Sequence, residues 1–96
     1  FSLEDSLHID TYFMSASGID PVIGCTDLGF SEANVQNQMR HAARRTVVYA
    51  DSSKFGRASL VRVCPIEEVD CIITDRGLSE EQKNAFMERG ANLIIV

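Results

Sequence analysis

The stretch Thr46-Val47-Val48-Tyr49-Ala50-Asp51-Ser52-Ser53-Lys54-Phe55-Gly56 decides the fold of this chain. Its first half is a β-branched, apolar run typical of a buried strand, and its second half is a polar loop. In α/β proteins, the loops at the carboxyl edge of the sheet point their polar groups into a shared crevice where ligands bind. The stretch therefore predicts a strand over residues 46–50 that leads into half of a polar pocket.

Further strands and helices are expected on both sides of this stretch. Short apolar runs predict strands over residues 11–16, 70–74 and 93–96. One helix is expected over residues 32–45, with Ser31 as N-cap and Val35, Met39, Ala42 and Ala43 on an apolar face, and another over residues 80–89, with Ser79 and Gln82 as a capping box and Gly90 as its stop. Residues 17–30 and 65–69 are expected to form turns and loops. Residues 59–63 fit a strand, although a short helix shares their pattern.

The order strand, helix, strand, strand, helix, strand predicts one α/β domain with a mostly parallel sheet and flanking helices. All strands of a parallel sheet end at the same edge. We therefore expect residues 17–20, 51–56 and 74–75 to lie on one side of the molecule.

Composition excludes several functional classes. The 96 residues suffice for one domain, and 45% hydrophobic and 24% charged residues are ordinary for a soluble globular protein. No apolar run approaches the roughly 20 residues of a membrane helix. The net charge of −5 argues against a nucleic-acid surface on this segment.

The three cysteines, Cys25, Cys64 and Cys71, have neither the spacing of a zinc site nor an even count. They are expected to be reduced packing residues in a cytoplasmic protein, and no metal or cofactor is expected. The chain starts at Phe1 without a signal segment and ends in an apolar run, so we expect a fragment of a longer protein.

The loop after the central strand carries the main candidate ligand-binding residues. Lys54 offers a point charge for phosphate or carboxylate, Asp51 an acceptor for sugar hydroxyls, and Ser52 and Ser53 rotatable hydroxyls. The alternative is that Asp51 and Ser52 only satisfy backbone groups of a turn while Lys54 is solvated. Spacing alone leaves both interpretations open.

Further candidates lie at the other predicted strand ends and at the start of the first helix: Ser17, Gly18, Asp20, Thr26, Glu32, Thr74 and Asp75. Each has a structural alternative. The loop residues can simply form turns, Glu32 can compensate the helix dipole, and Asp75 can cap a turn through Gly77. No catalytic Ser/His/Asp or Cys/His arrangement can be read around His8 and His41.

Taken together, these motifs resemble the effector-sensing domain of DeoR-type bacterial transcriptional repressors. The resemblance rests on Ser17-Gly18-Ile19-Asp20, Gly24-Cys25-Thr26, Ser31-Glu32-Ala33-Asn34-Val35, Ala50 to Arg57, and Ile72-Ile73-Thr74-Asp75, in the family's order. It implies a Rossmann-like fold similar to ribose-5-phosphate isomerase and the coenzyme A transferases, used to sense a phosphorylated sugar or related metabolite. It also implies that Asp51 and Lys54 are the principal pocket residues.

Members of that family carry an N-terminal winged helix-turn-helix and a Gly/Thr-rich phosphate loop, neither of which this sequence contains. Residues 1–96 are therefore expected to be the C-terminal portion of a sensor domain. The expected protein is a non-catalytic, homo-oligomeric repressor that binds a phosphorylated sugar and reaches DNA only through the absent N-terminal domain, without a membrane partner. The rival expectation is a phosphosugar isomerase that uses Asp51 and Asp75 as acid–base groups and Lys54 as a cation.

Overall fold

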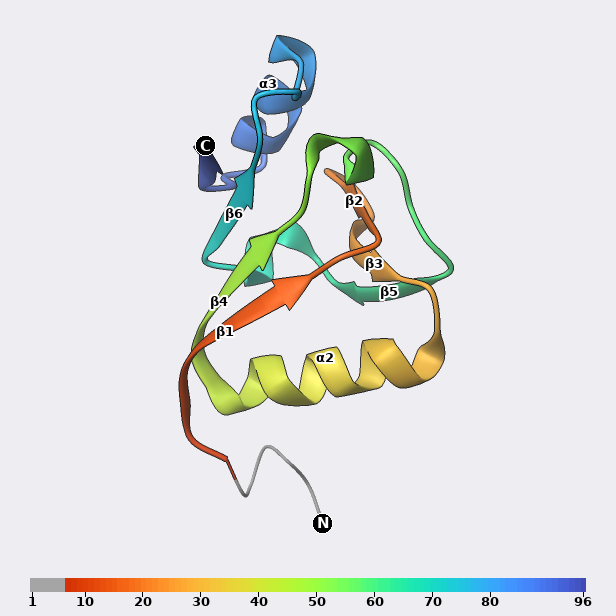
Figure 1. The fold of residues 1–96 in the computed structure, drawn as a ribbon, viewed down its shortest axis with the longest axis vertical. Coiled ribbons are helices and arrows are strands. Elements are labelled where there is room, and N and C mark those ends of the chain that lie inside the picture. Colours follow the sequence, from red (N-terminus) through yellow and green to blue (C-terminus); the bar gives the residue numbers. More distant parts are fainter. Residues whose placement is uncertain (1–6) are drawn as a thin grey trace.

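The computed structural model describes residues 7–96, whose largest sheet has four parallel strands. In spatial order these are β1 (Ile9–Ser15), β4 (Ala43–Tyr49), β6 (Cys71–Thr74) and β7 (Leu93–Ile95). Figure 1 shows β1 and β4 side by side and pointing the same way. All four predicted strands are confirmed, with β4 beginning at Ala43 rather than at residue 46. The α/β, Rossmann-like fold class is confirmed with them.

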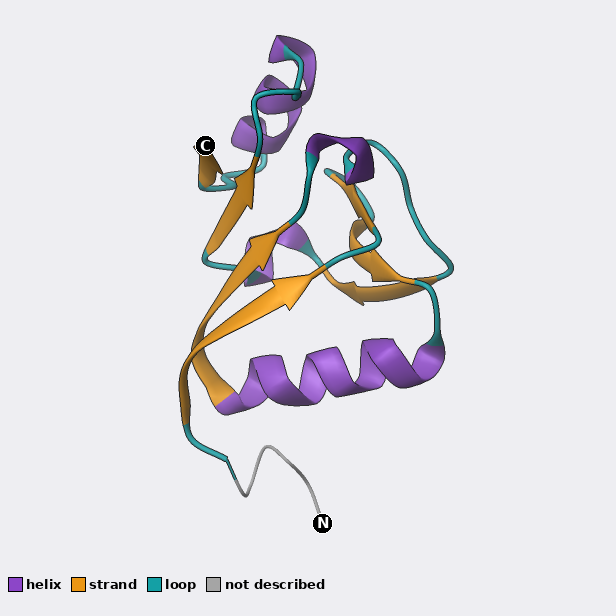
Figure 2. Cartoon of the chain, in the orientation of Figure 1, coloured by secondary structure: helices purple, strands orange, loops and turns teal. Residues whose placement is uncertain are grey.

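Two helices, α2 (Phe30–Ala42) and α3 (Glu80–Glu88), connect these strands (Figure 2). α3 starts as predicted, because the Ser79 hydroxyl accepts from the Gln82 backbone N–H and the Gln82 side chain accepts from the Ser79 N–H. Gly90, with a φ of 80°, follows the end of this helix. A left-handed residue at this position is a common way to stop a helix.

The details predicted for α2 were wrong. Gly29, not Ser31, occupies the N-cap, and the helix ends at Ala42. Val35 is 50% exposed, whereas Gln36 is buried. The packed side of α2 carries the buried Ala33 and Gln36, and the Gln36 side chain donates to the Ser15 carbonyl at 2.9 Å and accepts from the Tyr12 hydroxyl. A search for an apolar stripe therefore selected the wrong face.

A second, antiparallel sheet contains β2 (Gly18–Asp20), β3 (Gly24–Asp27) and β5 (Val61–Cys64). It corrects the prediction of turn and loop over residues 17–30, and it confirms a strand near residues 59–63. β2 and β3 are too short to show an alternating pattern, and β3 is completed by pairing with the distant β5. Gly24 permits this pairing, since a Cβ atom there would lie 2.3 Å from the Cys64 carbonyl oxygen.

The two faces of the parallel sheet differ in what covers them. The packed face includes Tyr12, Met14, Val48, Ile72 and Thr74. These residues occupy alternate positions of their strands and paired positions between strands, so their side chains point to the same side of the sheet. Met14, Val48 and Ile72 belong to one buried cluster with Phe86 of α3, and Tyr12 contacts α2. The connection from β1 to β4 and the connection from β6 to β7 both move the chain toward the same edge of the sheet. Right-handed crossovers therefore place both helices on this one face.

The bare face comprises Phe13, Val47, Tyr49, Ile73 and Ile94. Both helices lie on the other face, and on this one Phe13, Tyr49 and Ile94 are 60%, 50% and 42% exposed, whereas the central Val47 is 4% exposed. None of the helices described is long and apolar enough to cross a membrane. The bare face is thus a sheet surface whose outer part residues 7–96 leave open to solvent.

Candidate functional site

Three strand-end segments meet at the carboxyl edge of the parallel sheet, as predicted. The Ser52 backbone N–H donates to Asp75 Oδ2 at 3.0 Å, which joins the loop after β4 to the loop after β6. On the other side, the Gly56 N–H donates to the Ile19 carbonyl at 2.8 Å, and Ile19 forms a β-bridge with Phe55. Residues 51–56 therefore lie between residues 17–20 and residues 74–75.

Asp51 caps a single 3₁₀ turn, Ser52–Lys54. Its Oδ1 atom accepts from the Ser53 backbone N–H at 2.9 Å and from the Ser53 hydroxyl. These two hydrogen bonds lower the pKa of the Asp51 carboxyl. The turn-capping alternative for Asp51 is thus confirmed. Because the side chain is exposed and ionised, it is also open to a ligand.

Asp75 organises the neighbouring turn in the same way. Its two oxygens accept from the Ser52 N–H at 3.0 Å and from the Gly77 N–H at 2.7 Å, and these backbone hydrogen bonds lower the pKa of the Asp75 carboxyl. The cap through Gly77 is confirmed. Gly77 also lies close to the first loop, since a Cβ atom there would be 2.3 Å from Ser52 Oγ.

Lys54 is one cation of this edge that has no partner among residues 7–96. Its ammonium forms no hydrogen bond or ion pair with any of the residues 7–96, and its side chain is half-buried rather than extended into solvent. The positive charge lowers the pKa of Asp51, so the two groups feel each other's charge. An unpaired ammonium that shares a loop with the ionised Asp51 suits a ligand that carries both an anionic group and hydroxyls.

Thr74 ends β6 on the packed face, and its Oγ1 atom is buried without a hydrogen-bond partner among the described residues. Most buried hydroxyls in proteins are paired, and an unpaired one is costly. The structure thus contains one unsatisfied polar atom directly beneath the candidate site.

Thr26 and Gly18 lie inside the protein, which does not fit their predicted place in the pocket lining. The Thr26 hydroxyl donates to the Gly18 carbonyl at 2.9 Å and accepts from the Ser59 N–H at 2.8 Å. A Cβ atom at Gly18 would lie 2.7 Å from the Arg57 carbonyl oxygen. Both residues join β2 and β3 to the segment before β5, and so they support the edge rather than form its surface.

The other weaker candidates, Ser17, Asp20 and Glu32, interact with residues outside the 51–56 loop. Asp20 accepts from the Val22 N–H at 3.4 Å in the β2–β3 turn, and the Ser17 hydroxyl donates to Asp27 Oδ1 at 3.1 Å. Glu32 lies with Asp27 in a separate hollow of about 530 Å³ beside the start of α2. Figure 1 shows the start of α2 well away from the 52–54 turn. Asp27 was not among the predicted site residues, although it directly follows Thr26, which was.

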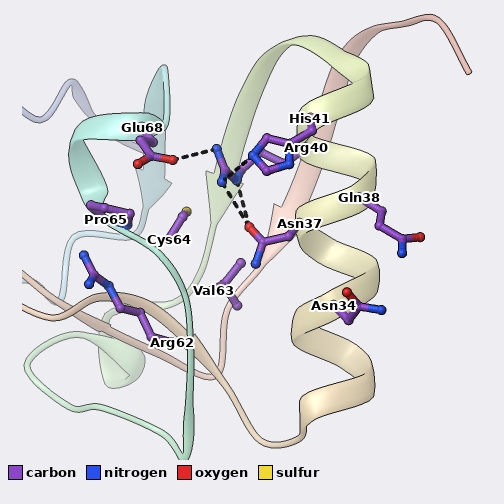
Figure 3. Close-up of a pocket in the computed structure, with 10 residues that line it drawn as sticks. All are labelled: Asn34, Asn37, Gln38, Arg40, His41, Arg62, Val63, Cys64, Pro65 and Glu68. Atoms are coloured by element: carbon purple, nitrogen blue, oxygen red, sulfur yellow. Dashed lines mark hydrogen bonds and ion pairs between the residues drawn. The ribbon is translucent and has the colours of Figure 1, made fainter. Parts of the chain in front are cut away.

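A further cavity, of about 620 Å³, lies elsewhere, between α2 and β5 (Figure 3). Its lining is mainly polar and basic: Asn34, Asn37, Gln38, Arg40, His41, Arg62, Val63, Cys64, Pro65 and Glu68. Arg40 forms an ion pair with Glu68 at 3.0 Å and donates to Asn37. Sequence reasoning did not find this cavity, because its two walls are far apart in the chain. Residues 7–96 contain no group of three or more His, Cys, Asp and Glu side chains suited to a metal ion.

Comparison with known proteins gives the family context. The protein-family model of the DeoR C-terminal sensor domain matches residues 2–76 of this chain. A putative aga operon transcriptional repressor of Escherichia coli O157:H7 is 32% identical over 89 residues, which are 93% of this chain and 33% of that protein.

Two further relatives have similar coverage. The HTH-type transcriptional regulator IolR of Bacillus subtilis is 31% identical over 80% of this chain and 31% of its own length. The HTH-type transcriptional regulator GlpR of Haloferax volcanii is 29% identical over 97% and 36%. The chain thus spans about a third of the length of these relatives, all of which are regulators and none an enzyme.

Proposed function

Because the chain belongs to the DeoR C-terminal sensor-domain family, we propose that its carboxyl edge binds a phosphorylated sugar or a related anionic metabolite. The domain is part of a transcriptional regulator and not an enzyme. Binding changes the affinity of the intact regulator for its operator DNA. The proposal includes action in the cytoplasm and as a homo-oligomer.

One observation carries this proposal: an unpaired Lys54 ammonium lies beside the ionised Asp51 on a loop held to Asp75 and to Ile19 by backbone hydrogen bonds. The ammonium suits the anionic group of the ligand, and the carboxylates suit its hydroxyls. Since the loop touches two other strand-end segments, a ligand that moves it also shifts its neighbours. Such a ligand can favour one of two conformations of the regulator by its differential affinity.

Acid–base catalysis at this edge is a poor fit. Hydrogen bonds lower the pKa values of both Asp51 and Asp75, whereas a general acid or base works best with a pKa near the operating pH. The isomerase alternative therefore has support neither from the relatives nor from the carboxylates on which it depended.

The bare face supports a second part of the proposal, namely that residues 1–96 are the C-terminal portion of a larger sensor domain. Parallel sheets are almost always covered on both faces, yet α2 and α3 cover only one. The curated relatives have about two thirds of their length outside the matched region. We assign the bare face to βα units of that remaining segment, which also supplies further ligand contacts such as a phosphate cradle.

The test is a thermal-shift titration of the intact regulator with a panel of sugar phosphates. We expect one of them to raise the melting temperature, because a ligand that binds only the folded state stabilises it. Lys54→Ala is expected to abolish most of the rise. Lys83→Ala is the matched control, because Lys83 is the other lysine of the chain and pairs only with Glu80 on the surface of α3.

Two results would contradict the proposal. A rise of the same size in Lys54→Ala would remove Lys54 from the site. The absence of a rise with every sugar phosphate, in a protein whose operator binding is intact, would refute this class of ligand.

A further inference from the structure

Two of the three cysteines face each other across the antiparallel sheet. Cys25 on β3 and Cys64 on β5 are direct register partners. Directly opposed residues of antiparallel strands have Cα atoms about 4.5–5.5 Å apart, and disulfides span about 4.4–6.8 Å between Cα atoms. A bond between these two sulfurs therefore needs no rearrangement of the strands. Cys71 lies on β6 of the other sheet.

Cys64 also lines the cavity between α2 and β5. Figure 3 shows its side chain pointing from β5 toward Arg40, with Arg62 on the other side. Cys25 is fully buried behind it. Only one sulfur of the pair therefore borders a space that a small oxidant can enter.

The charges around the pair distinguish the two thiols. A side-chain hydrogen bond from Cys25 lowers the pKa of Cys64, and the positive charges of Arg40 and Arg62 act in the same direction, while burial and Glu68 oppose them. The same hydrogen bond and burial raise the pKa of Cys25. Since the thiolate is the nucleophile, Cys64 is the thiol that reacts first.

We propose that Cys25 and Cys64 form a reversible dithiol–disulfide site, in which Cys64 reacts with a hydroperoxide that enters the cavity and Cys25 resolves the product. The Cys64 thiolate attacks the peroxide oxygen, becomes a sulfenic acid and, with H₂O₂, releases hydroxide. The Cys25 sulfur then attacks the Cys64 sulfur and displaces its oxygen as water. Overall, two thiols and H₂O₂ give one disulfide and two waters, and a dithiol reductant reverses the change.

The bond would tie β3 to β5 next to the candidate effector site. Thr26 follows Cys25 in β3, and its hydroxyl holds both Gly18 and Ser59. Oxidation is therefore expected to stiffen the hairpin whose Ile19 carbonyl accepts from Gly56 of the ligand-binding loop. The disulfide itself does not depend on the proposed effector function.

The test treats the folded chain with a few equivalents of H₂O₂ and blocks the remaining thiols with N-ethylmaleimide under denaturing conditions. We expect the oxidised chain to carry one N-ethylmaleimide group, on Cys71, and to be otherwise lighter by two hydrogen atoms, about 2 Da, with a Cys25–Cys64 cross-link in the peptide map. Digestion needs Glu-C as well as trypsin, because trypsin alone leaves Cys64 and Cys71 in one peptide, residues 63–76. Dithiothreitol is expected to restore the original mass.

Three single variants assign the roles. Cys64→Ser is expected to abolish the mass change. Cys25→Ser is expected to leave a Cys64 sulfenic acid that dimedone traps. Cys71→Ser is the matched control, since Cys71 is also buried, and it should oxidise like the wild type.

The proposal is overturned if the cross-link involves Cys71, if the folded chain keeps all three thiols, or if the rate of oxidation equals the rate of global unfolding measured by hydrogen exchange. The absence of a rise in melting temperature with every sugar phosphate would leave the mass change intact, so the two proposals fail separately.

Discussion

The packed and bare faces of the parallel sheet are built from the same strands but have opposite environments. On β1, Met14 is 1% exposed and its neighbour Phe13 is 60% exposed. Tyr12, Phe13 and Met14 form one continuous apolar run, which is typical of a strand covered on both sides. The strand composition is thus suited to two covered faces, whereas the helices of this chain cover one. The contrast teaches that an apolar residue in a strand indicates burial in the complete fold, even where the side chain is exposed in the structure of one segment.

The first prediction concerns the free energy of unfolding when one residue on each face of the parallel sheet is replaced with alanine. Met14→Ala should lower the free energy of unfolding of the chain by about 3 kcal/mol, because it opens a cavity in the buried cluster. Phe13→Ala should lower it by less than about 1 kcal/mol, because more than half of that side chain already contacts solvent. Urea denaturation followed by circular dichroism measures both. Equal losses in the two variants would show that the bare face is covered in solution.

The second prediction concerns what the bare face contacts. The double substitution Phe13→Ser/Tyr49→Ser should reduce binding of a hydrophobic dye to the isolated chain and reduce its self-association in sedimentation, because it removes the two largest exposed apolar groups of the sheet. In the intact regulator the same double substitution should cost about 3 kcal/mol or more, since both side chains would then be buried. An intact regulator that tolerates it at no cost would exclude the bare face as an internal interface.

The smallest effect is expected at Thr74, the polar residue at the end of β6 on the packed face. Thr74→Val replaces the unpartnered hydroxyl with a methyl group of similar size and should raise the free energy of unfolding by about 1 kcal/mol. Ser79→Ala, at the α3 N-cap, is the opposing control and should lower it by about 1 kcal/mol. A destabilised Thr74→Val chain would mean that the hydroxyl has a partner in solution.

Long-range pairing explains which parts of the fold could be predicted. The four parallel strands and the capping box of α3 were predictable because apolar runs and the Ser79–Gln82 spacing are local signals. β2 and β3 were not, since neither has an apolar pattern and β3 is completed by β5, far along the chain. The same reason explains α2, whose packed side carries the hydrogen-bonded Gln36 rather than a run of apolar residues.

The candidate site divides in the same manner. Parallel topology was enough to predict that the loops after β4 and β6 meet, and Ser52 and Asp75 confirm it. Burial of Thr26 and Gly18 could not be predicted, because it depends on the backbone of residues 57–59 passing directly over them. Glu32 was grouped with the loop because α2 follows the small polar segment in sequence, yet its neighbour in space is Asp27.

The amino-acid sequence by itself determined the α/β class, the positions of the parallel strands, the loop Asp51–Gly56 and the family. These properties depend on periodicity and on short motifs, which act over a few residues. Only the tertiary structure decided that residues 7–96 cover one face of the parallel sheet, that Lys54 has no partner among those residues and that Cys25 lies opposite Cys64. Those properties depend on contacts between segments that are far apart in the sequence, and no local sequence pattern specifies these contacts.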